Sequence, residues 1–136
     1  YVDAASLYLV QRPERFDVLM TENRFGAILS DLAAGLVGGM GMAPSGDVGD
    51  RYAVFQPSHG SAPDIAGKGC ANPVATILSV AMMLDWLGPA TAPGGRLIRE
   101  AVARVLADGT VRTRDLGGET GTAEMGSRIA EDVACA

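Results

Sequence analysis

Apolar residues recur at helical spacing in several segments of this chain, and short extended patterns separate them. In residues 24–35, for example, Phe25, Ile28, Leu29 and Leu32 fall on one side of a helix. Helices are predicted over residues 4–11, 24–35, 72–88, 97–108 and from residue 122 onward, and strands over residues 16–21 and 53–56. The alternation of helical and extended patterns predicts the α/β fold class.

Glycine, proline and capping residues mark the boundaries between these elements. Residues 38–46 hold too much glycine to be regular throughout, and residues 57–71 and 88–95 are predicted loops. We expect Asn23, Asn72 and Thr122 to cap helices, with Pro73 in the first helical position. The helix after Pro73 is apolar nearly all round, so it is predicted to be buried.

Composition and charge exclude several classes of protein. The chain has 136 residues and a net charge of −5, and Lys68 is its only lysine, so we expect no nucleic-acid partner. No stretch of about 18 uncharged apolar residues occurs, so no membrane-spanning helix and no membrane partner are predicted. Cys70 and Cys135 lie far apart and indicate neither a disulfide nor a zinc framework.

The N-terminus has neither an initiator methionine nor the pattern of a secretory signal. We interpret the chain as a fragment or a processed product, and we expect a reducing, cytoplasmic location.

The predicted loop over residues 57–71 is the first candidate site. It contains the single histidine, His59, and several glycines, and it opens onto the helix predicted to begin at Asn72. Small residues let a backbone approach a ligand closely, and N–H groups at a helix start favour an anionic or nucleotide ligand. Asp64 could accept hydrogen bonds from ribose hydroxyls and would repel a 2′-phosphate. From these residues alone, a glycine-rich surface loop with a solvated histidine is an open alternative.

The amino-acid sequence of that loop is similar to one found in a known protein family. His59-Gly-Ser-Ala-Pro-Asp-Ile-Ala-Gly-Lys-Gly, followed by Ala71-Asn-Pro, resembles the cofactor loop of the isocitrate and isopropylmalate dehydrogenases, which include tartrate and D-malate dehydrogenases. Tyr1-Val-Asp-Ala-Ala, Thr21-Glu-Asn-Arg-Phe-Gly and Asp115-Leu-Gly-Gly resemble further motifs of that family in the same order. The resemblance runs the length of the chain and implies the C-terminal part of the two-lobed isopropylmalate dehydrogenase-like fold.

The resemblance implies a binding site for the adenosine half of a nicotinamide cofactor. Members that use NADP usually carry a basic or aromatic pair where this chain has Asp64 and Ile65, so the resemblance favours NAD. The implied cofactor-binding residues are His59, Gly60, Ala62, Asp64, Ile65 and Asn72.

The resemblance also implies a Mg²⁺ or Mn²⁺ site, and here the chain departs from the family. Three aspartates are expected as ligands, because hard cations prefer oxygen. Asp3, which would serve the partner subunit's site, and Asp31 match two of them. The third falls on position 27, which is Ala27, so we expect weakened metal binding.

The implied function is NAD- and metal-dependent oxidative decarboxylation of a 2-hydroxy diacid of the tartrate, malate, isocitrate or isopropylmalate type. Residues 1–37 would end the smaller, dimer-forming lobe, and residues 38–136 would belong to the larger, cofactor-binding lobe. The family's substrate-binding arginines and its proton-handling tyrosine and lysine would lie upstream of Tyr1, so no catalytic residue is assigned. We expect a homodimer or a complementing chain. The alternative function is a catalytically incompetent fragment or a nucleotide-binding, regulatory subunit.

Overall fold

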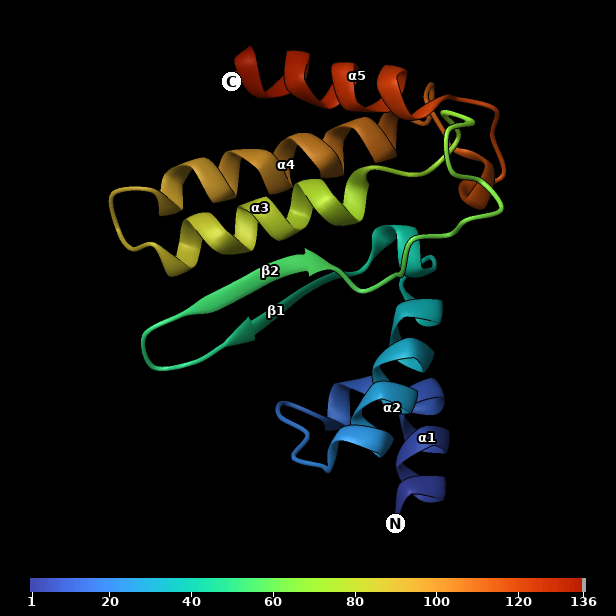
Figure 1. Ribbon diagram of the computed structural model, residues 1–136, viewed down its shortest axis with the longest axis vertical. Coiled ribbons are helices and arrows are strands. Elements are labelled where there is room, and N and C mark those ends of the chain that lie inside the picture. Colours follow the sequence, from blue (N-terminus) through green and yellow to red (C-terminus); the bar gives the residue numbers. More distant parts are fainter. Residues whose placement is uncertain (136) are drawn as a thin grey trace.

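The computed structural model describes residues 1–135 and combines helices with one two-stranded sheet, which confirms the predicted mixed class (Figure 1). The α-helices are α1 (Val2–Gln11), α2 (Asn23–Leu36), α3 (Val74–Trp86), α4 (Ala92–Asp108) and α5 (Thr122–Ala134). The strands are β1 (Pro44–Val48) and β2 (Ala53–Pro57). Three short 3-10 helices connect them: η1 (Pro13–Arg15), η2 (Met40–Met42) and η3 (Arg114–Leu116).

Layers of helices are stacked on the hairpin of β1 and β2. The strands are antiparallel, with Pro44 opposite Pro57 and Val48 opposite Ala53. Helix α3 packs on both strands, α4 packs on α3, and α5 packs on α4 (Figure 1). Gly46 of β1 leaves room for the ring of Phe55, its partner on β2, and for Met82 of α3, because a Cβ there would lie 3.0 Å from the ring and 3.2 Å from the Met82 methyl.

The hydrophobic core lies between α3, α4 and α5. Its buried residues are Val74, Ala101, Val102, Val105, Val111, Met125 and Ile129. Met125 and Ile129 lie on one face of α5 and Val133 packs against the same cluster, as the predicted helical spacing requires. The core therefore holds the start of α3 and the start of α5 in place, and the residues between and around those starts form the candidate site.

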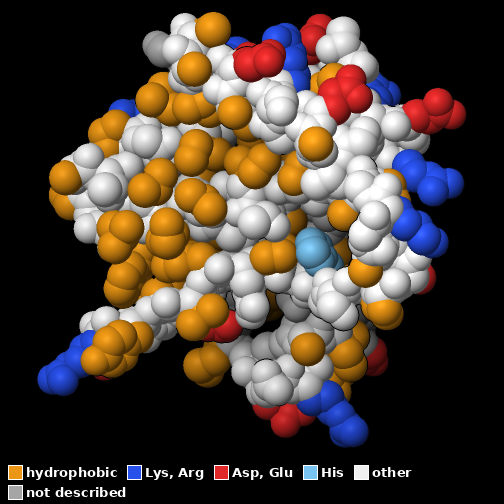
Figure 2. Space-filling view, turned by 45° about the horizontal axis from the view of Figure 1, so that its top comes forward, with side chains coloured by type: hydrophobic (Ala, Val, Ile, Leu, Met, Phe, Trp, Pro, Cys, Tyr) orange, Lys and Arg blue, Asp and Glu red, His pale blue; other side chains and the backbone are white. Residues whose placement is uncertain are grey.

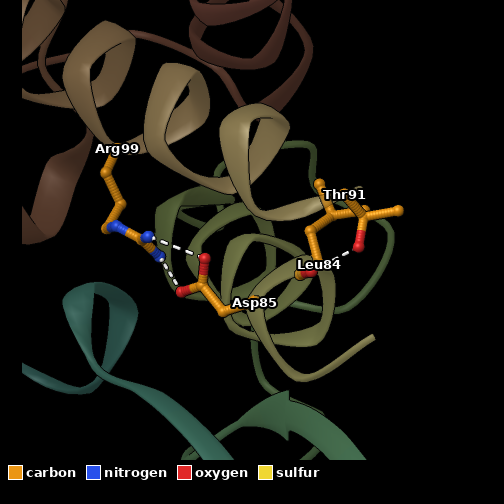
Figure 3. A network of polar contacts seen from close by, with 4 residues as sticks. All are labelled: Leu84, Asp85, Thr91 and Arg99. Atoms are coloured by element: carbon orange, nitrogen blue, oxygen red, sulfur yellow. Dashed lines mark hydrogen bonds and ion pairs between the residues drawn. The ribbon is translucent and has the colours of Figure 1, made fainter. Parts of the chain in front are cut away.

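The corner between α3 and α4 is fixed by a close backbone approach and by polar contacts. A Cβ at Gly95 would lie 2.6 Å from the carbonyl oxygen of Ala81, so only glycine fits there. The guanidinium of Arg99 faces the carboxylate of Asp85 through two contacts of 2.8 and 3.0 Å (Figure 3). This hydrogen bond to Asp85 is the largest effect and raises the pKa of Arg99, burial opposes it, and the attraction between the two charges adds a smaller rise. The Thr91 hydroxyl donates to the carbonyl of Leu84 over 2.6 Å.

Helices α1 and α2 form a pair at the opposite end of the molecule from α5 (Figure 1). Leu9, Leu29 and Ala34 are buried within this part, whereas Leu7, Val10 and Ile28 are exposed. Figure 2 shows further hydrophobic side chains at the surface, and Val80, Trp86 and Leu87 are exposed at α3 and its C-terminal end. The lobe boundary near residue 37 stays a prediction. Among residues 1–135, no helix is both long enough and apolar enough to span a membrane.

Two predictions about extended structure are wrong. Residues 16–21 form no strand, because no other strand of the described chain lies beside them to pair with their backbone. Val18 and Met20 are accordingly 87% and 98% exposed. The glycine-rich stretch before residue 47 contributes β1, which was not predicted because Pro44 and Gly46 are poor strand formers.

Several predicted helix boundaries also need correction. Asn23 is the first residue of α2, and no side chain caps that helix. Helix α4 begins at Ala92, inside the predicted loop 88–95, with Pro93 in its first turn. Gly95 occurs inside this helix because the contact with α3 leaves no room for a Cβ. Thr122 likewise lies within α5 and Gly121 is the cap residue. Helix α3 is only partly buried.

Candidate functional site

The loop between β2 and α3 borders an open cavity of about 600 Å³. Residues 59–62, 65–67 and 69–72 line it from the loop. Gly41 of η2, Arg114 and Asp115 of η3, and Thr122 of α5 complete the wall. A Cβ at Gly60, Gly67 or Gly69 would meet no atom within 4 Å, so the backbone at these positions stays open to a ligand. In Figure 2 the pale-blue side chain of the single histidine is visible at the molecular surface.

A hydrogen-bond network around Asn72 fixes the inner end of this cavity. The Asn72 side chain accepts a hydrogen bond from the backbone N–H of Val74, the first residue of α3, over 3.0 Å. Asn72 was predicted to cap this helix with Pro73 in its first position, but Pro73 is the cap residue and the helix begins one residue later. Its amide donates to one carboxylate oxygen of Asp115 over 2.9 Å, and the buried Thr113 hydroxyl donates to the other over 2.5 Å. A Cβ at Gly41 would lie 2.6 Å from that carboxylate, so η2 also packs closely here.

The downstream end of the loop is attached to the start of α5. The backbone N–H of Thr122 donates to the carbonyl of Gly69 over 2.8 Å, and its hydroxyl donates to the carbonyl of Ala71 over 2.5 Å. Gly121 lies against the same segment, since a Cβ there would be 3.2 Å from the Gly69 oxygen. Two segments about 50 residues apart are thereby joined at the cavity.

The middle of the loop is held in unusual backbone conformations. Ala62 has φ of 43° and is the one non-glycine residue with positive φ among residues 1–135. This left-handed region disfavours residues with a Cβ, and such strain is concentrated at functional sites. The N–H of Ile65 donates to the Ala62 carbonyl over 3.0 Å and closes a turn after it. His59 donates from Nδ1 to the carbonyl of Gly60 over 2.8 Å, which leaves Nε2 as an acceptor.

Most of the predicted cofactor-binding residues are brought together at this cavity. His59, Gly60, Ala62, Ile65 and Asn72 line it. Asp64 does not; it is exposed, between two residues that do, and its role as a ribose contact stays a prediction.

No ligand contact was predicted for the part of the wall that lies outside the loop, which consists of Gly41, Arg114, Asp115 and Thr122. Cys70 is half-buried in the wall. The Asp115-Leu-Gly-Gly motif was the one feature of the sequence that pointed to η3. It resembles a turn of the family, but the sequence does not show that this turn contacts the cavity.

The predicted metal ligands lie on separate helices, and their role stays a prediction because Asp3 is expected to serve the site of a partner subunit. Asp3 lies on α1 and Asp31 on α2, both exposed, and Ala27 is one helical turn before Asp31. No group of three or more His, Cys, Asp or Glu side chains gathers anywhere in residues 1–135. A divalent cation takes six or more oxygen ligands, of which several must come from protein. The donor set of this chain by itself does not fit Mg²⁺ or Mn²⁺.

The fold and the cavity define an α/β protein with a ligand site built where the loop after a strand enters a helix. Comparisons then place it among known proteins. The family described as "Isocitrate/isopropylmalate dehydrogenase" matches residues 1–129. The chain therefore belongs to the isocitrate/isopropylmalate dehydrogenase family, which confirms the predicted resemblance.

Individual relatives match nearly all of this chain with a part of their own. Isocitrate/homoisocitrate dehydrogenase of Thermus thermophilus is 58% identical over 96% of this chain and 38% of its own length. Homoisocitrate dehydrogenase of Methanocaldococcus jannaschii is 53% identical over 94% of this chain and 36% of its own. The crystal structure of isocitrate dehydrogenase from Methylococcus capsulatus superposes with a TM-score of 0.91 at 50% identity, over 97% of this chain and 39% of that one. The chain thus spans well under half the length of these relatives.

Proposed function

We propose that this chain carries the adenosine-binding part of an NAD-linked dehydrogenase that oxidises and decarboxylates a 2-hydroxy diacid. The observation that carries the proposal is the cavity at residues 59–72, where five of the six predicted cofactor-binding residues gather. Family membership supports the reaction class, and the relatives named for isocitrate and homoisocitrate support a 2-hydroxy acid that carries more than one carboxylate.

The cavity suits the adenosine part of a dinucleotide. Its wall is built largely of Gly and Ala backbone with the side chain of Ile65, which gives a planar base an apolar surface on which to lie. Nε2 of His59 offers an acceptor for a hydroxyl or amino group of the ligand. Because Asn72 and Asp115 bind each other, the inner wall is fixed before a ligand arrives. When bound, the nicotinamide at the other end of the cofactor would accept the hydride.

We propose Asp64 as the origin of a preference for NAD. Its carboxylate is exposed at the edge of the loop, beside lining residues Ala62 and Ile65. A carboxylate there accepts hydrogen bonds from ribose hydroxyls and repels a 2′-phosphate.

A second candidate function is a nucleotide-binding or regulatory subunit without catalysis of its own. The specific observation in its favour is Ala27, which stands where the family resemblance implies a metal-binding aspartate. Both candidates need another polypeptide segment, because this chain spans 36–38% of its relatives. We propose that a second copy or a complementing chain covers the exposed apolar residues of α1 and α2, among them Leu7, Val10 and Ile28.

Calorimetric titration of the purified chain with NADH and with NADPH tests the proposal. We expect micromolar binding of NADH and weaker binding of NADPH. Asp64→Asn should reduce the ratio of the affinity for NADH to that for NADPH. The matched variant Asp50→Asn, in the exposed turn between β1 and β2, should leave this ratio unchanged. If the folded chain binds neither nucleotide, the assignment of this cavity to a dinucleotide is wrong.

Mn²⁺ titration separates the two candidate functions. A chain that binds NADH and, once joined by the missing segment, binds Mn²⁺ and turns over a 2-hydroxy diacid is the dehydrogenase. A joined protein that binds NADH but neither binds Mn²⁺ nor turns over is the regulatory subunit.

A further inference from the structure

The hairpin of β1 and β2 has two open edges. The sheet in residues 1–135 consists of these two strands, so each strand has a partner on one side only. At the turn end of the hairpin, the N–H of Gly49 donates to the carbonyl of Tyr52 over 2.9 Å. At the other end, the N–H of Ser58 donates to the carbonyl of Ala43 over 3.2 Å. Because hydrogen-bonded and non-hydrogen-bonded pairs alternate in an antiparallel ladder, these two bonds determine which backbone groups point outward.

On β2 the outward-pointing backbone groups belong to Ala53 and Phe55. Both residues are in non-hydrogen-bonded pairs, Ala53 opposite Val48 and Phe55 opposite Gly46. Their N–H and C=O groups therefore point away from β1, and they make no hydrogen bond with any other segment of residues 1–135. A row of unpaired backbone groups on an edge strand is a template for a further strand.

The outer edge of β2 suits pairing with an identical strand. Two copies of β2 can run antiparallel about a two-fold axis, with Ala53 of each copy opposite Phe55 of the other. Each of these residues then donates and accepts one backbone hydrogen bond across the contact. Val54, which is 57% exposed, lies directly opposite Val54 of the second copy, and β-branched pairs of this kind stabilise a sheet. No residue of β2 carries a charge that would oppose the pairing.

The outer edge of β1 does not suit the same pairing. With Gly46 opposite Val48 of the second copy, Asp47 would lie opposite its own copy, and like charges in that position are destabilising. A register centred on Gly46 avoids this repulsion but places Val48 opposite Pro44, which has no N–H to donate. Charge and hydrogen bonding therefore both favour the edge of β2.

We propose that two copies of this chain associate through the outer edges of β2 and form one continuous antiparallel sheet. Both copies use the same residues in this two-fold contact, so association through it stops at a dimer. A wider sheet also stabilises the hairpin, because two strands alone are marginally stable. The contact differs from the apolar surface of α1 and α2 and does not depend on which ligand occupies the cavity.

Sedimentation equilibrium of the purified chain over a range of concentrations tests the proposal, and we expect a monomer–dimer equilibrium. Ala53→Pro removes an outward N–H that the hairpin does not use and places a ring where the second strand would lie. It should weaken association by at least about tenfold, since each dimer loses two hydrogen bonds. Val48→Pro makes the matched change on the outer edge of β1, directly opposite Ala53, and should leave association unchanged. Circular dichroism confirms that both variants are folded.

A second variant tests the contact without changing the backbone. Val54→Lys keeps every backbone donor and replaces an exposed side chain, so the fold is retained. It places like charges opposite each other across the contact, and it should weaken association more at low salt than at high salt.

Three results would overturn the proposal. A chain that is monomeric at every concentration leaves the edge of β2 to a strand from outside this sequence. A dimer that persists unchanged in both Ala53→Pro and Val54→Lys uses another surface, such as that of α1 and α2. An equal loss of association in Val48→Pro and Ala53→Pro would show that the two edges are not distinguished.

Discussion

The side-chain amide of Asn72 and the carboxylate of Asp115 are joined by a hydrogen bond of 2.9 Å, although 43 residues separate them in the sequence. The bond connects the start of α3 with the turn before α5. Asn72 is buried, so its amide has few alternative partners in water. This single contact closes the inner wall of the cavity and links it to the core.

Replacing Asp115 with alanine should lower the free energy of unfolding by about 1–3 kcal/mol, because the buried Asn72 amide and Thr113 hydroxyl lose their acceptors. Urea denaturation followed by circular dichroism measures the change. Glu119→Ala removes an exposed carboxylate nearby that makes no hydrogen bond or ion pair with residues 1–135, and it should be neutral. Equal stability of the two variants would contradict the structural role of Asp115.

The contact between α3 and α4 predicts opposite effects for two glycine substitutions. Gly95→Ala should cost about 1–3 kcal/mol, because its Cβ would lie 2.6 Å from the Ala81 carbonyl oxygen and the two helices would have to separate. Gly126→Ala lies within α5 with no atom inside 4 Å of the new Cβ, and it should stabilise by up to about 1 kcal/mol. Alanine improves helix propensity equally at both sites. The difference in thermal stability between the two variants therefore measures the cost of the steric clash at position 95. A stabilised Gly95→Ala variant would show that the helices do not touch there.

The pair of Arg99 and Asp85 should contribute little to stability. Both side chains are more than 40% exposed, so solvent screening limits the contribution to less than about 1 kcal/mol. Pairing raises the pKa of a basic group, so its contribution is complete at neutral pH and would be lost only in strong alkali. Arg99→Ala should therefore change the midpoint of urea denaturation slightly at low salt and not at high salt. A large effect that persists in high salt would mean that the arginine stem, and not its charge, holds the corner.

Ala27→Asp should create affinity for Mn²⁺. Positions 27 and 31 are one turn apart on α2, so the variant places a second carboxylate on the face that carries Asp31. Binding of Mn²⁺, measured by electron paramagnetic resonance, should tighten by at least about tenfold, since affinity rises with the number of charged oxygen ligands. Ser30→Asp adds the same charge on another face of α2 and serves as the control. An equal response of both variants would point to nonspecific attraction by charge.

The helices of this chain were predictable where one apolar face repeats. Met125, Ile129 and Val133 place α5 correctly, and Asn72 binds the first backbone N–H of α3 close to where a cap was predicted, although Pro73 is the cap residue. The predictions that were wrong concern elements whose structure depends on residues distant in the sequence. Residues 16–21 have the composition of a strand, yet a strand exists only when another one pairs with it. Glycine occupies position 95 of helix α4 because the Ala81 backbone leaves room for nothing larger, and this contact cannot be seen in the local sequence.

The candidate site was predictable on its loop side only. The loop residues of the site are close together in the sequence, so a single motif predicts all of them: His59, Gly60, Ala62, Ile65 and Asn72. Gly41, Arg114 and Thr122 line the same cavity although up to about 80 residues separate them in the sequence. The local sequence pattern does not indicate contacts between such distant segments. For Asp64 the opposite holds: its place in the motif predicts a ligand contact, but Asp64 is not among the residues that line the cavity.

The residues around the cavity come from positions 41 to 122, and none comes from α1 or α2. Ligand binding is thermodynamically linked to folding only for the segments that the ligand holds together. A nucleotide in excess should thus raise the melting temperature of the unit formed by the hairpin, α3, α4 and α5. The α1–α2 pair would melt at an unchanged temperature. Calorimetric scans would then resolve one ligand-dependent transition and one indifferent to ligand, and the molecule would unfold in two steps even though it is a single chain.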